Sequence, residues 1–246
     1  MANWSDPRAT AARPVPGTGF GQEGVALDAG LRSYMLSVYN YMASGVLLTG
    51  IVALLFANSS AAPAILFGPG ILKYVIMFSP LAFVLVLSFG INRLSTGAMQ
   101  ALFWAFATVM GLSMASIFFV FTNTSIATTF FATAAAFVSL SLWGYTTKKD
   151  LSGFGTFLIM GVVGLIVASL LNLWFQSSVL TMAISAIGVL LFAGLTAYDT
   201  QRIKSMYAYV AGTDMMGKTA IMGALSLYLD FINMFTFLLQ FLGQRD

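Results

Sequence analysis

Long apolar stretches separated by short polar segments dominate the chain from residue 31 onward. A helix that crosses a bilayer needs about 20 predominantly apolar residues in succession. Seven stretches meet that requirement, at about 35–57, 73–92, 97–121, 125–146, 153–173, 179–201 and 219–242. The pattern therefore predicts an all-α polytopic membrane protein, a bundle of seven transmembrane helices.

Local features refine three of these predicted helices. Pro80 lies inside the second and is expected to kink it, with Ser79 and Ser88 placed to satisfy backbone groups that the proline frees. Only 122-TNT-124 separates the third from the fourth, which predicts a very tight turn. Small residues recur over 132–141 in the fourth, which indicates close packing against a neighbouring helix.

Composition supports the membrane prediction. The chain is 59% hydrophobic and 8% charged, with a mean hydropathy of +0.90, whereas soluble domains carry about 25% charged residues. It has no cysteine and no histidine. These absences exclude a disulfide framework, a zinc site built on those ligands and a histidine general base.

Residues 1–30 differ from the rest of the chain. They are rich in Pro, Gly, Ala and Thr, show no hydrophobic periodicity and lack the apolar core of a signal peptide. We expect a flexible cytoplasmic tail over 1–30 and one helical membrane domain over 31–246.

The basic residues predict the orientation. With the N-terminus inside, nine of the eleven lie in inner segments and two in outer segments, which agrees with the positive-inside rule. The inner set is Arg8, Arg13, Arg32, Arg93, Lys148, Lys149, Arg202, Lys204 and Lys218, and the outer set is Lys73 and Arg245. We expect a bacterial inner membrane, a cytoplasmic N-terminus, an external C-terminus, and the polar linker 202–218 at the cytoplasmic surface.

Two acidic residues inside apolar segments are the candidates for chemistry. Asp230 lies in the middle of the last segment, where a charged side chain costs about 2.5–3.5 kcal/mol on insertion scales. Ser226 and Asn233 share its helix face at i−4 and i+3, and Thr196 shares a face with Asp199 on the sixth helix. This polar stripe predicts that the last helix faces the interior of the bundle.

Simpler interpretations of these residues remain open. The stripe around Asp230 is also typical of a hydrogen-bonded seam that only joins helices. Asp199 precedes Arg202 by three residues, which suits a local ion pair near the membrane surface. Arg93, between the second and third helices, is either a counter-charge for Asp199 or an ordinary residue of a positive-inside loop.

If the two carboxyls meet, they can act as a proton-sensitive gate. Two carboxyls in a site of low dielectric cannot both ionise cheaply, so they share a proton. Double ionisation pushes the helices apart or recruits a cation, and calcium prefers carboxylate and carbonyl oxygens. We expect Asp199 and Asp230 to be transient calcium ligands along a permeation path, without a resident cofactor.

Four stretches resemble the transmembrane Bax inhibitor motif family, also called the Bax inhibitor-1 family, and its bacterial members in particular. The longest match is 224-ALSLYLDFINMFTFLLQFLG-243, the last helix of the family. The others are 194-GLTAYDTQRIK-204, 147-TKKDLSGFG-155 and 111-GLSMASIF-118, and the four lie in family order. The resemblance implies a seven-helix bundle with the last helix at its centre.

The resemblance also has functional implications. It implies a di-aspartyl proton sensor at Asp199 and Asp230, a pH-dependent calcium leak, and an arginine latch for which Arg93 is the candidate. Some bacterial relatives instead resemble substrates or modulators of a membrane-bound AAA protease, with the N-terminal tail as the handle. Membrane lipid, calcium, protons and that protease are the expected partners, and no nucleic acid is expected.

Other classes fit less well. Intramembrane aspartyl proteases also pair two aspartates, but they carry Gly-x-Gly-Asp where residues 227–230 read Leu-Tyr-Leu-Asp, and no proline follows Pro80. A retinal receptor needs a lysine that the seventh predicted helix lacks. A pure scaffold would use Asp230 only for packing. We therefore expect a protein that is not an enzyme.

Overall fold

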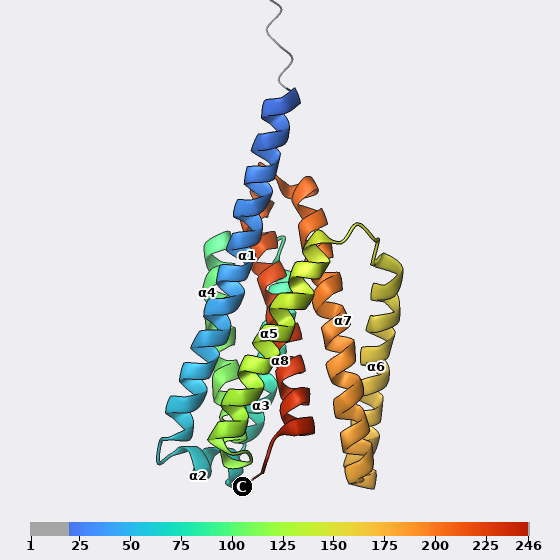
Figure 1. Ribbon diagram of the computed structural model, residues 1–246. Coiled ribbons are helices and arrows are strands. Elements are labelled where there is room, and N and C mark those ends of the chain that lie inside the picture. The colour runs from blue at the N-terminus through green and yellow to red at the C-terminus, as the bar shows by residue number, and fades with distance from the viewer. Residues whose placement is uncertain (1–19, 246) are drawn as a thin grey trace, which may run out of the picture.

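The computed structural model describes residues 20–245 and is a bundle of helices (Figure 1). Seven of these helices are long and apolar enough to cross a membrane, which confirms the predicted all-α polytopic membrane fold. The helices are α1 (Phe20–Ala57), α2 (Ala62–Phe67), α3 (Leu72–Gly90), α4 (Thr96–Met114), the 3₁₀ helix η1 (Ala115–Phe119), α5 (Asn123–Thr146), α6 (Ser152–Phe175), α7 (Ser178–Val210) and α8 (Met215–Leu242).

Two helices extend beyond the apolar segments that predicted them. α1 begins at Phe20, inside the segment expected to be a tail, and residues 1–19 of that expectation lie outside the described residues. α7 continues to Val210, so most of the expected linker 202–218 is helical. Hydropathy detects only membrane-crossing lengths, whereas residues 20–30 and 202–210 lie outside the apolar segments and contain no proline, which would end a helix.

Polar side chains determine where several helices begin. The hydroxyl oxygens of Ser95, Thr122 and Ser177 accept hydrogen bonds from backbone N–H groups three residues later, at 3.2, 3.2 and 3.3 Å. Such caps satisfy donors that the first turn leaves unpaired. Thr122 thereby starts α5 directly, which confirms the tight turn predicted at 122–124.

Pro80 lies inside α3 as predicted. Proline cannot donate to the carbonyl oxygen four residues earlier, which here belongs to Ile76. The hydroxyl of Ser79 donates to that oxygen at 3.1 Å instead, so the prediction for Ser79 is confirmed. Ser88 makes no side-chain hydrogen bond within the described part of the chain.

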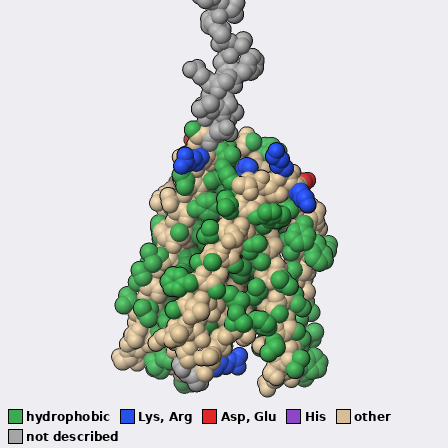
Figure 2. All heavy atoms as spheres, in the orientation of Figure 1, with side chains coloured by type: hydrophobic (Ala, Val, Ile, Leu, Met, Phe, Trp, Pro, Cys, Tyr) green, Lys and Arg blue, Asp and Glu red, His purple; other side chains and the backbone are tan. Residues whose placement is uncertain are grey.

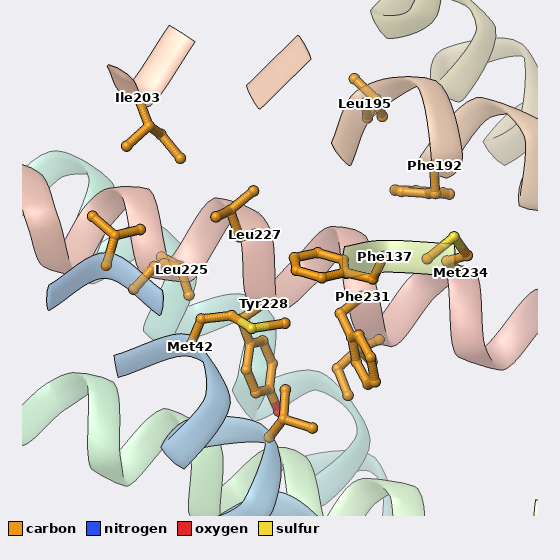
Figure 3. Packing of buried hydrophobic residues seen from close by; sticks show 14 of the residues in the cluster. Met42, Phe137, Phe192, Leu195, Ile203, Leu225, Leu227, Tyr228, Phe231 and Met234 are labelled. Atoms are coloured by element: carbon orange, nitrogen blue, oxygen red, sulfur yellow. The ribbon is translucent and has the colours of Figure 1, made fainter. Parts of the chain in front are cut away.

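α8 is the central helix, as the family resemblance implied. In its membrane-crossing window 61% of the residues are buried, against 17–39% in the other six spans. α8 packs against α1, α4, α5 and α7, while α3 packs on α4 and α6 packs on α7 at the periphery. Figure 3 shows side chains leaving α8 in different directions, with Tyr228 toward α1 and α4 and Leu227 toward α7. The ring of Phe231 lies 5.6 Å from that of Phe137 on α5.

Charge is distributed unevenly between the two ends of the bundle. Lys and Arg side chains gather at the end where α1 begins, and apolar side chains cover much of the remaining visible surface (Figure 2). We call the first of these the basic end. It carries Arg32, Arg93, Lys148, Lys149, Arg202, Lys204 and Lys218, while Lys73 and Arg245 lie at the opposite end.

α5 and α7 approach each other closely at Gly144. A Cβ atom added at Gly144 would collide with the backbone carbonyl of Ala197, 2.9 Å from its carbon. Such an approach requires glycine, because any side chain would push the two backbones apart. The close packing that small residues over 132–141 predicted for this helix therefore extends to its last turn.

Gly144→Ala is expected to lower the free energy of unfolding by about 1–3 kcal/mol, the usual cost of overpacking. Gly164→Ala in α6 is the matched control, since an added Cβ there has no atom within 4 Å. It should raise stability by about 0.5–1 kcal/mol, because alanine favours a helix over glycine. Thermal unfolding in detergent would measure both, and equal effects would contradict the close contact.

Candidate functional site

α7 and α8 are antiparallel, and two glycines show how they are aligned. A Cβ added at Gly223 of α8 would lie 3.1 Å from Cγ2 of Ile203, and one added at Gly188 of α7 would lie 2.6 Å from Cγ of Phe237. Ile203 is thus level with Gly223, and Gly188 is level with Phe237. Between these two points the helices keep one register.

That register places the two aspartates about one helical turn apart. By interpolation Asp199 is level with residues 226–227, and Asp230 is level with residues 195–196. Every side chain of a helix leans toward the N-terminus of its own helix. Because the helices are antiparallel, the two carboxyls lean toward each other along the interface.

The two carboxyls have different surroundings. Asp230 is only 5% exposed, and its Oδ2 has no hydrogen-bond partner among the described residues. Asp199 is nearer the basic end, and its Oδ1 lies 3.8 Å from Nη1 of Arg202. The Arg202 side chain is 55% exposed, so solvent weakens this pair. The charge of Asp230 therefore has less compensation than that of Asp199.

The supporting polar residues mostly bond within their own helices. Thr196 is fully buried and donates to the carbonyl of Phe192 at 2.8 Å, and Asn233 donates to the carbonyl of Leu229 at 2.8 Å. Ser226 is half-buried on α8. Within the described residues, neither Thr196 nor Asn233 is hydrogen-bonded to either carboxyl.

Arg93 is exposed at the basic end. Within the described residues, the ion pair of Asp199 is with Arg202 rather than with Arg93. The local pair considered from the sequence is therefore present, and the latch by Arg93 stays a prediction.

Gln201 anchors the loop between α5 and α6 beside the site. Its amide donates to the carbonyl of Lys149 at 2.8 Å and accepts from the N–H of Leu151 at 2.9 Å. In the same loop, hydrogen bonds from the hydroxyl and the N–H of Ser152 lower the pKa of the exposed Asp150 carboxyl. Two of the stretches that carry the family resemblance are thus in direct contact.

A buried chain of hydroxyls that sequence analysis missed joins α1, α5 and α7. Thr200 donates to the carbonyl of Thr196 at 2.7 Å, and its oxygen lies 2.9 Å from the hydroxyl of Ser141. Each hydroxyl has one proton, so Ser141 donates to Thr200, and Tyr39 donates to Ser141 at 2.6 Å. The chain ends on the turn of α7 that carries Asp199.

A second missed contact joins α8 to α1 and α4. Thr49 donates to the carbonyl of Ala107 at 2.8 Å, so the fully buried Tyr228 must donate to Thr49, at 2.6 Å. The sequence contains a weak signal, a tyrosine two residues before Asp230. Hydroxyls in apolar helices are common, however, and their spacing does not reveal which of them bond across helices.

Within the described residues, no group of three or more acidic, histidine or cysteine side chains could hold a metal ion. The two carboxyls therefore form a pair and are not part of a larger group of metal-ligating side chains among the described residues. A pair of this kind can hold a proton between its oxygens or offer them to a passing hard cation.

Known proteins match almost the whole chain. The family described as inhibitor of apoptosis-promoting Bax1 matches residues 31–246. Inner membrane protein YbhL of Escherichia coli K12 is 47% identical over 219 residues, covering 88% of this chain and 94% of YbhL. A protein of Rickettsia prowazekii is 48% identical over 219 residues, covering 89% and 92% of the two chains. A protein of Caulobacter vibrioides is 45% identical over 245 residues, covering 94% and 95%.

Asp230→Asn is expected to stabilise the fold by about 1 kcal/mol, because it removes a buried ionisable group with an unpaired oxygen. The amide keeps the shape of the side chain and can donate toward Asp199. Asp214→Asn, at an exposed position before α8, is the control and should change stability little. Thermal unfolding in detergent would measure both variants. A loss of stability in Asp230→Asn would mean that the carboxyl itself makes a stabilising interaction in the bundle.

Proposed function

This chain belongs to the Bax inhibitor-1 family, and from that premise we propose that it is a proton-controlled calcium leak in a bacterial inner membrane. The proposal rests on the register of α7 and α8, which directs Asp199 and Asp230 toward each other, and on Oδ2 of Asp230, which has no hydrogen-bond partner among the described residues. A helix-joining seam would not need an ionisable group at that point.

Charge on the pair acts on the interface between α7 and α8. With one proton between them, the carboxyls attract, and the central helix stays packed on α7. When that proton leaves, two negative charges face each other in surroundings of low dielectric, where repulsion is much stronger than in water. The helices then separate, or a cation enters between them. Calcium suits this position because its preferred ligands are oxygens.

An aromatic cluster supports the assignment of a gate. On α8, Phe231 and Phe235 follow Asp230 toward the end opposite the basic end. Phe130 of α5 lies edge-on to both, with ring centroids 5.6 and 6.2 Å away, and Phe137 lies 5.6 Å from Phe231. In our proposal these rings block the path between the carboxyl pair and the opposite end while the pair holds its proton.

The distribution of charge supports an orientation. Seven basic residues of the described chain lie at the basic end and two at the other. The positive-inside rule places the basic end in the cytoplasm, so α1 begins inside and α8 ends outside. The name of YbhL, an inner membrane protein, supports the same membrane for this chain.

Calcium flux into proteoliposomes is expected to rise from about pH 6 to about pH 8, because the shared proton that closes the gate is lost as the pH increases. Asp199→Asn and Asp230→Asn should each abolish this pH dependence, since neither can form a pair of negative charges. Fluorescence of a calcium indicator inside the liposomes would measure the flux.

Asp214→Asn is the matched control, because it removes a carboxylate outside the pair and should leave the pH profile unchanged. A normal profile in the double variant of Asp199 and Asp230 would exclude the proposed sensor. Absence of flux above that of empty liposomes at every pH would exclude the leak. The role as a protease modulator would then be tested by deleting residues 1–30 and following the degradation of the protein.

A further inference from the structure

A groove runs between α1 and α5, which both pack on α8. Its volume is about 700 Å³, within the roughly 300–1,000 Å³ of pockets that hold small ligands. Leu36 of α1 and Val138 of α5 form its rims and are 51% and 64% exposed. Buried Met42, Phe137 and Phe231 form its floor. The groove is therefore open sideways, toward the surface that faces lipid.

The length of the groove fits the acyl chain of a membrane lipid. It extends along α1 from Arg32 to Val46, about 21 Å at the rise of an α-helix. This length is about 6 Å more than half of the ~30 Å hydrocarbon core, so the groove spans the depth of one leaflet and reaches beyond it.

Charge is present at one end of the groove only. Arg32 is the one charged side chain among the described residues that line it, and it lies at the basic end. Tyr145 lines the same end, and Lys204 lies over its ring, with Nζ 4.7 Å from the centroid. The hydroxyls of Tyr39 and Ser141 already have partners in the chain that leads to α7. The remaining lining is almost entirely apolar.

We propose that this groove binds an anionic phospholipid of the leaflet at the basic end. One acyl chain lies along Met42, Phe137 and Phe231, and the headgroup phosphate is bound by Arg32, whose guanidinium matches phosphate geometry. Lys204 adds positive potential at the mouth of the groove. The site does not depend on the proposed calcium leak, and no calcium is needed to test it.

The test is native mass spectrometry of the full chain, purified with equal amounts of phosphatidylglycerol and phosphatidylcholine of identical acyl chains. The wild type is expected to retain one phosphatidylglycerol in preference to phosphatidylcholine. Arg32→Gln should reduce that preference about tenfold, since it removes the charged partner of the phosphate. Ala134→Phe should abolish retention of both lipids, because Ala134 lines the groove and phenylalanine would fill it.

Two control variants distinguish lipid binding in the groove from nonspecific attraction of anionic lipid to the basic end. Arg93→Gln removes another cation of the basic end, and Ala135→Phe places the same ring on an exposed neighbour that does not line the groove. Both should behave as the wild type. No preference in the wild type, equal losses in Arg32→Gln and Arg93→Gln, or unchanged retention in Ala134→Phe would overturn the proposal.

A second measurement covers the case in which Ala134→Phe does not fold. Wild-type protein would be photolabelled with phosphatidylglycerol that carries a diazirine near the end of its acyl chain. Adducts on Met42, Val46 or Phe137 are expected, because these residues line the groove away from its basic mouth. Adducts confined to the outer faces of α3 or α6 would overturn the site.

Discussion

A carboxyl group in the middle of a membrane bundle must be neutralised by a proton, a cation or hydrogen bonds, because an isolated charge is too costly there. Asp230 is subject to this constraint, and it lies on the helix against which α1, α4, α5 and α7 all pack. Any change in its charge therefore acts at the centre of the fold. In the proposed gate the other carboxyl of the pair, Asp199, belongs to α7, so the change in charge acts on the α7–α8 interface.

The hydroxyl contacts divide the remaining bundle into two parts. Thr49 and Tyr228 tie α8 to α1 and α4, and Ser141, Thr200 and the close approach at Gly144 tie α5 to α7. These contacts are satisfied and carry no net charge, so they should not respond to pH. The interface between α7 and α8 combines close apolar packing with an ionisable pair. Under the proposed function, this interface is therefore the one that changes between two arrangements of the same helices.

Hydropathy was sufficient to predict the seven spans, because a bilayer requires long apolar helices and few other structures. It could not predict the start of α1 at Phe20 or the end of α7 at Val210, since both lie in segments too polar to cross a membrane. The presence of acidic residues inside apolar segments made Asp199 and Asp230 the candidates for a functional site. Their register could not be predicted, because it depends on which glycines of α7 and α8 accept large side chains from the partner helix.

The groove and the carboxyl pair share the central helix. Phe231, on the floor of the groove, is the residue next to Asp230, and Ser141 in the groove is bonded to Thr200, one position after Asp199. A lipid that binds one arrangement of α7 and α8 better than the other must change how readily the pair releases its proton. Coupling of this kind is reciprocal, because it is a free energy shared by two sites. The two proposals together therefore require that deprotonation of the pair alter the affinity of the groove for lipid by the same factor.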